Sequence, residues 1–181
     1  YKARVPAGWL SLLVNAGDGI DLDVFLTRQP KDRMIRKLGQ QLRINRSKIK
    51  EASDTNTDFD DLDGAIRSGY FLKDGLSDNE DFYYLNLLIT VTADSVDDLE
   101  WKVAEMKKLL LSQDMDVQTC SFCQEQAFLS SLPLVSLERQ LYERSKRNVL
   151  TSGAASCYPF TSYEMCDDNG ILLGVNKHNN S

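Results

Sequence analysis

The sequence has 1 histidine, His178, and 4 cysteines in 181 residues. A lone imidazole near the end of the chain argues against a Ser/His/Asp catalytic set and against a His-rich metal site. No run approaches the ~20 apolar residues of a membrane-spanning helix, and no signal peptide is visible. No Gly-x-x-x-x-Gly-Lys segment is present to cradle nucleotide phosphates. The net charge of −6 speaks against a general binder of nucleic acid or anionic membranes.

The chain is long enough for a hydrophobic core of its own. Its length of 181 residues suggests one domain with a tail or two small domains. A chain of this size buries about 70% of its unfolded surface on folding and needs no disulfide bonds for stability. We therefore interpret the cysteines as reduced thiols. Because the chain begins with Tyr1 and not Met, we expect a piece of a longer protein.

The longest apolar segment, residues 82–92, is rich in aromatic and β-branched side chains. This composition predicts a strand that is covered along one face and on part of the other. A helical pattern over residues 95–111 follows, with Ser95 as its expected cap. Its apolar stripe, spaced by three and four residues, consists of Val96, Leu99, Val103, Met106 and Leu110.

The remaining patterns complete an α+β fold. In chain order, we expect strands at 9–15 and 20–27, helices at 31–52 and 58–70, the strand and helix just described, a strand at 115–119 and a helix at 124–132. The order β-β-α-α-β-α-β-α predicts a mixed or antiparallel sheet with helices on one face, followed by an extended linker tail. We place a docking domain over 1–134, and over 135–181 a linker and the first strand of an absent domain. We expect residues 136–181 to be held weakly, or by a neighbouring copy, because their partner domain would be absent.

The predicted helix at 31–52 is strongly basic. Its candidate contact residues are Arg33, Arg36, Lys37, Arg43 and Arg46. Such a stripe could bind the phosphates of nucleic acid or lipid head groups, or an acidic partner surface. The interpretation that we favour is a solvated face neutralised by the acidic stretch that follows, because no aromatic residue is interleaved to stack on bases.

Two other sets of residues are weaker candidates. Cys120 and Cys123 form a Cys-x-x-Cys at a predicted strand-to-helix turn, which suits a thiol–disulfide site or half of a zinc site. We favour two ordinary buried thiols. Asp21 and Asp23 share one face of a predicted strand, which we interpret as solvated.

A resemblance to a known family involves mainly the last third of the chain. The residues concerned are Ser131-Leu132-Pro133-Leu134, Arg147, Leu150-Thr151, Tyr158-Pro159-Phe160 and the run from Asn169 to Asn176. Their order and approximate spacing resemble the junction between the N-terminal domain and the motor in the conjugation ATPases of type IV secretion systems. Members from conjugative elements of Gram-positive bacteria are most similar. The upstream basic helix, long strand and Asp-rich helix start resemble that domain more loosely.

The resemblance implies the N-terminal domain of a conjugal transfer ATPase, cut before the motor domain. The parent would use ATP and Mg and would be cytoplasmic, peripheral at the inner face of the bacterial membrane. The implied partners are its own motor domain, other copies of itself and secretion-channel proteins; direct DNA binding is conceivable but not expected. We therefore expect a docking and oligomerisation role without catalytic, cofactor or metal residues. Two alternatives stay open: a phosphate-binding module using residues 31–50, and a thiol–disulfide protein using Cys120 and Cys123.

Overall fold

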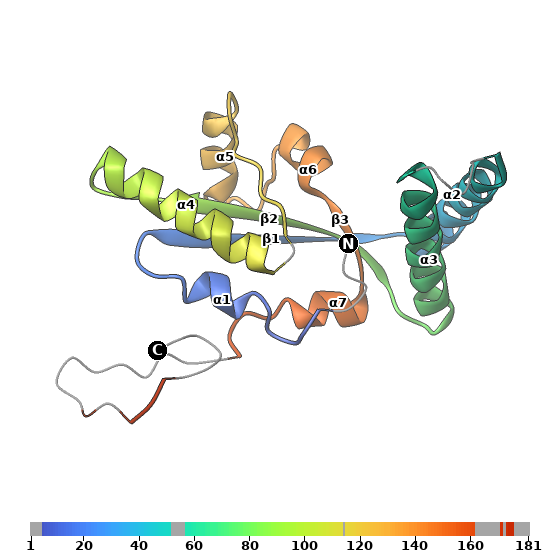
Figure 1. Ribbon diagram of the computed structural model, residues 1–181, viewed down its shortest axis with the longest axis horizontal. Coiled ribbons are helices and arrows are strands. Elements are labelled where there is room, and N and C mark those ends of the chain that lie inside the picture. Colours follow the sequence, from blue (N-terminus) through green and yellow to red (C-terminus); the bar gives the residue numbers. More distant parts are fainter. Residues whose placement is uncertain (1–4, 52–56, 114, 162–170, 172, 176–181) are drawn as a thin grey trace.

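The computed structural model describes residues 5–51, 57–113, 115–161, 171 and 173–175. It has the expected α+β class, with helices around a three-stranded sheet in the order β1-β2-β3 (Figure 1). The elements are α1 (Ser11–Val14), β1 (Ile20–Gln29), α2 (Lys31–Glu51), α3 (Thr57–Ser77), β2 (Phe82–Val91), α4 (Val96–Ser112), α5 (Gln124–Ser131), α6 (Arg139–Ser145), β3 (Arg147–Leu150) and α7 (Thr151–Ser156).

The sheet is antiparallel throughout. β1 and β2 pair along their whole length of 10 residues, from Ile20 opposite Val91 to Gln29 opposite Phe82. β3 pairs only with the first four residues of β2. β2 is therefore the central strand, and its long apolar sequence matches the burial of side chains on both of its faces.

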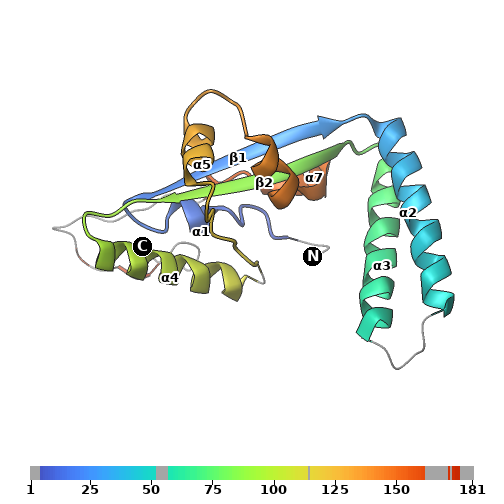
Figure 2. The ribbon, with the colours of Figure 1, turned by 90° about the horizontal axis from the view of Figure 1, so that it is seen from above.

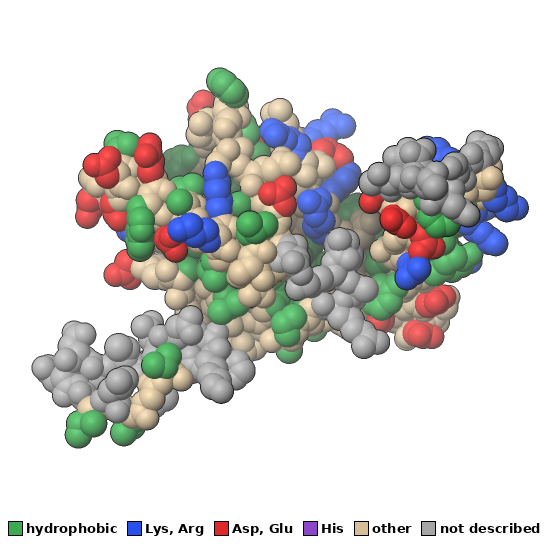
Figure 3. All heavy atoms as spheres, in the orientation of Figure 1, with side chains coloured by type: hydrophobic (Ala, Val, Ile, Leu, Met, Phe, Trp, Pro, Cys, Tyr) green, Lys and Arg blue, Asp and Glu red, His purple; other side chains and the backbone are tan. Residues whose placement is uncertain are grey.

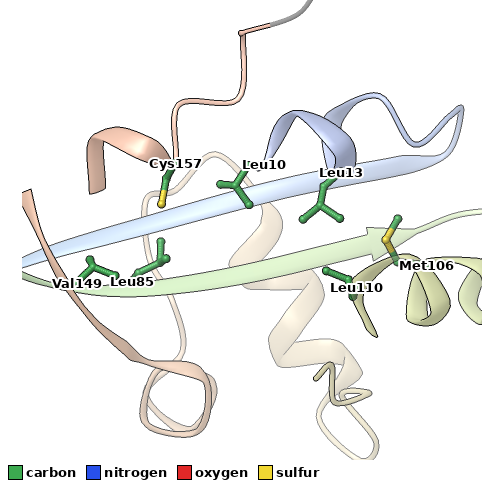
Figure 4. Packing of buried hydrophobic residues seen from close by; sticks show 7 residues of the cluster. All are labelled: Leu10, Leu13, Leu85, Met106, Leu110, Val149 and Cys157. Carbon is green, nitrogen blue, oxygen red and sulfur yellow. The ribbon is translucent and has the colours of Figure 1, made fainter. Parts of the chain in front are cut away.

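Two hydrophobic clusters lie on opposite faces of the sheet, because successive side chains of a strand alternate between faces. The first, shown in Figure 4, comprises Leu10, Leu13, Leu85, Met106, Leu110, Val149 and Cys157. The second comprises Met34, Leu38, Leu72, Leu76, Phe82, Tyr84 and Leu150. The prediction of helices on one face is therefore wrong: α4 and the segments around α1 and α7 pack on the first face, and α2 and α3 pack on the second.

α2 and α3 form a helical hairpin inserted between the two long strands. Each helix has 21 residues, and the pair projects from one end of the sheet (Figure 2). The second cluster fixes the base of the hairpin. Farther along the hairpin the two helices also pack closely, since a Cβ added at Gly69 of α3 would lie only 2.8 Å from Cδ2 of Leu42 on α2.

Two predicted strands are wrong. Residues 9–15 contain α1 instead, and the burial of Leu10 and Leu13 gives the reason. Side chains three residues apart share a helix face but would lie on opposite faces of a strand, so only the helical turn directs both into the core. Residues 115–119 join no strand ladder. The three longest helices, α2, α3 and α4, and the two longest strands, β1 and β2, agree with the predicted types.

The segment after residue 134 supplies part of the core. β3 completes the sheet, and Leu141, Val149, Leu150 and Cys157 are all buried. The expectation of weak packing is therefore wrong for residues 139–157, although the domain boundary near residue 134 stays a prediction. The strand expected at 171–175 is not seen at residues 171 and 173–175, and residue 172 lies outside the described part. None of the helices in the described ranges is long and apolar enough to cross a bilayer.

Candidate docking surface

The outward face of α2 is a basic surface on a projecting element. Arg33, Arg36, Lys37, Arg43 and Arg46 are all exposed, as the sequence pattern predicts. The inward face carries the buried residues Met34, Leu38, Leu42 and Asn45. Apart from these, the helix has eight basic and two acidic residues, which gives it a net charge of +6 in a chain of net charge −6.

Three of the basic side chains of α2 form one stripe. Arg36, Arg43 and Lys50 are seven residues apart, close to two helical turns, and therefore lie along the same side of the helix. Among the described residues, no ion pair involves a basic side chain of α2. We expected the acidic residues that follow α2 to neutralise its basic face. As far as the side chains of those acidic residues are described, no such neutralisation is seen.

Two of the predicted contact residues have partners within the fold. Lys37 donates from Nζ to the Tyr84 hydroxyl at 3.2 Å and lies 5.9 Å from the centroid of that ring. Arg46 donates from Nη1 to the Tyr70 hydroxyl of α3 at 3.1 Å. These contacts attach α2 to the sheet and to α3. The basic residues thus divide into a structural pair and an outward set that contains Arg33, Arg36 and Arg43.

A polar cleft separates α3 from the sheet. It has a volume of about 520 Å³ and is lined by Asp60 and Asp61 on one side and by Lys146 and Arg147 on the other. Lys146 forms an ion pair with Glu143, which raises the pKa of the lysine and lowers the pKa of the carboxyl. The charge of Lys146 is therefore already compensated within the fold.

The two thiols of the Cys-x-x-Cys are placed at the start of α5. Cys123 is buried and Cys120 is half-buried. Burial and the neighbouring Cys123 raise the pKa of the Cys120 thiol. A redox or nucleophilic cysteine needs the opposite shift. Nowhere in the described ranges do three or more His, Cys, Asp or Glu side chains gather as a metal site would require.

The carboxylates of β1 do not form a second site. Asp21 is exposed and Asp23 is half-buried on the same face of the strand, as their spacing predicts. Burial, and then the charge of Asp21, raises the pKa of Asp23. This pair has no third ligand-forming side chain beside it in the described part of the chain.

A second exposed surface, which the sequence did not reveal, lies on the outward side of α4. Val96 is 70% exposed and Trp101 is 62% exposed, beside the exposed carboxylates Asp97 and Glu100. Val96 was expected in the core, but it occupies the first turn, where α4 extends beyond the cluster around Met106. The only sequence signal for Trp101 is that it falls outside the apolar stripe.

Comparison of the chain with models of protein families, with curated proteins and with solved structures gave no match. The assignment to the conjugation ATPases therefore depends on the quoted residues and is a proposal below.

Proposed function

We propose that this chain is a non-catalytic docking and oligomerisation domain. The observation that carries the proposal is the outward face of α2, where exposed arginines that form no ion pair with described residues stand on a hairpin that projects from the sheet. Ionised side chains that are held out in this way contribute little to the stability of their own fold. They are suited to recognising an acidic surface on another molecule, where they set orientation and association rate.

We further propose that the parent protein is a conjugation ATPase of a type IV secretion system. The support is the order and spacing of the residues quoted for the resemblance, some of which have structural roles here. Leu150 is buried at the base of the hairpin, and the Thr151 hydroxyl accepts a hydrogen bond from the Asp81 amide at 2.9 Å. In this proposal ATP and Mg bind the motor domain, and the parent is cytoplasmic and peripheral at the inner face of the membrane.

The reading frame beyond Ser181 tests the family assignment. We expect it to continue into a Gly-x-x-x-x-Gly-Lys-Ser/Thr loop, and we expect the encoded motor segment to co-purify with the present chain. The chain alone should hydrolyse no ATP above the buffer background. A frame that stops at Ser181, or ATP hydrolysis by the isolated chain, would contradict the proposal.

A second candidate function uses the same face of α2. The stripe of Arg36, Arg43 and Lys50 is long enough, at about 21 Å, to follow a run of phosphates. Binding of a DNA duplex or of anionic vesicles that weakens steeply with salt would favour this phosphate-binding module. The thiol–disulfide alternative is less favoured, because Cys123 is buried, Cys120 is half-buried, and burial raises the Cys120 pKa, whereas a reactive thiol needs a lowered one.

A further inference from the structure

A basic helix face and an acidic helix start lie at opposite ends of the long axis of the molecule. α2 lies at one end, and α4 begins at the other (Figure 1). Figure 3 shows Asp and Glu side chains gathered at the end where α4 begins, and Lys and Arg side chains beside the carboxylates of α3 at the end formed by the hairpin. Because α2 alone carries a net charge of +6, the remainder of the chain carries −12.

The first turns of α4 combine free carboxylates with an exposed aromatic ring. Asp97 and Glu100 are exposed and form no ion pair with described residues, whereas Asp98 is paired with Lys102 at 3.2 Å. Trp101 follows Glu100, one helical turn after Asp97, and is mostly exposed. Large exposed apolar side chains that are rimmed by charge are typical of protein interfaces, and Trp and Arg dominate their binding energy.

We propose that copies of this chain associate head to tail, with the Arg36–Arg43 stripe of one copy on the first turns of α4 of the next. Asp97 and Glu100 pair with the two guanidinium groups, and Trp101 provides a flat surface on which one of them stacks. The proposal rests on the oligomerisation role proposed above and specifies its two surfaces. Since the surfaces differ and lie at opposite ends, each copy uses both, and the contact builds a ring or a filament.

The observations favour a second copy over a polyanion as the occupant of α2. A nucleic acid or an anionic membrane would approach a body whose remaining charge is −12. No aromatic residue lies on α2 to stack on bases. The chain itself, in contrast, offers at Asp97 and Glu100 carboxylates that form no ion pair with the described residues. Lys107 and Lys108 lie farther along α4 and would repel the basic side chains of α2. In the proposed contact α2 therefore crosses α4 near its first turns and does not lie along it.

Charge reversal at either surface tests the proposal by sedimentation velocity over a range of concentrations and salt. The first variant is Arg36→Glu/Arg43→Glu and the second is Asp97→Lys/Glu100→Lys. The unmodified chain should associate and lose association as salt rises. Each variant alone should associate at least about tenfold more weakly. An equimolar mixture should recover association. The α2 surface of the first variant, which carries Glu, can then bind the α4 surface of the second variant, which carries Lys. The unmodified α2 surface of the second variant can bind the unmodified α4 surface of the first.

The control is Arg67→Glu/Lys73→Glu on α3, which changes the net charge by the same amount as the α2 variant. It should associate like the unmodified chain, and circular dichroism should show that every variant folds. A mixture that stays monomeric, or an unmodified chain that stays monomeric at low salt, overturns the proposal. So does a 20-base-pair duplex or a phosphatidylserine vesicle that binds the α2 face of an otherwise monomeric chain. A reading frame that stops at Ser181 would remove the motor but would leave this association intact, so the two failures are distinguishable.

Discussion

At the scale of single residues, Gly75 is placed where α3 meets the sheet. A Cβ at this position would lie 2.3 Å from Cδ1 of Leu150, which is itself buried. Gly75→Ala should therefore lower the free energy of unfolding by about 1–2 kcal/mol, because overpacking outweighs the helix propensity of alanine. Gly64→Ala in the same helix meets nothing within 4 Å and should raise it by up to about 1 kcal/mol. Urea denaturation measures both, and equal shifts would contradict the packing argument.

Cys120 allows a second test at this scale, through pH. Burial and Cys123 raise the pKa of its thiol, so the thiolate fraction near neutral pH is below that of an ordinary cysteine. In a chain where the other three cysteines are serine, loss of Cys123 leaves burial, the largest single cause of the raised pKa, in place. Alkylation by iodoacetamide should then still rise with pH without a midpoint below about 8.5. A midpoint near pH 7 would support the thiol–disulfide alternative.

At the scale of elements, the start of α4 is fixed by its cap. The Ser95 hydroxyl accepts a hydrogen bond from the Asp98 amide at 3.2 Å, as the capping pattern predicts. Ser95→Ala should lower the free energy of unfolding by about 1 kcal/mol, since an amide of the first turn loses its acceptor. Ser95→Asp should retain most of the stability. Thermal unfolding of the two variants measures the difference, and an unchanged midpoint for alanine would show that the cap contributes nothing.

The elements that the sequence predicted correctly are those with many repeats of one period. β2 and α4 each contain enough apolar positions to distinguish strand from helix. β3 has four residues, Arg147–Leu150, and no alternation, so its conformation is set by pairing with β2.

Asn86 was likewise missed as a structural residue. Its Nδ2 donates to the Tyr142 carbonyl at 3.0 Å and to Ser145 Oγ at 2.7 Å, and these contacts hold α6 over the sheet.

At the scale of the whole molecule, the candidate surface could be predicted only in part. The basic stripe of α2 follows from sequence spacing, and its projection on a hairpin follows from the insertion of α2 and α3 between paired strands. The partners of Lys37 could not be foreseen, because Tyr84 is 47 residues away and meets it only through the register of the sheet. The exposure of Trp101 depends in the same way on which side of α4 packs against the core.

The same long-range pairing predicts that the chain cannot be divided at residue 134. A chain that ends there loses β3 and four buried side chains: Leu141, Val149, Leu150 and Cys157. Deleting several buried side chains costs about 2–5 kcal/mol each, which together approaches the whole stability of a domain. We therefore expect residues 1–134 to show no cooperative thermal transition by circular dichroism. Adding a peptide of residues 135–161 should restore one, because the strand can pair in trans. A truncated chain that unfolds cooperatively at the midpoint of the full chain would instead place the domain boundary where the sequence pattern suggests.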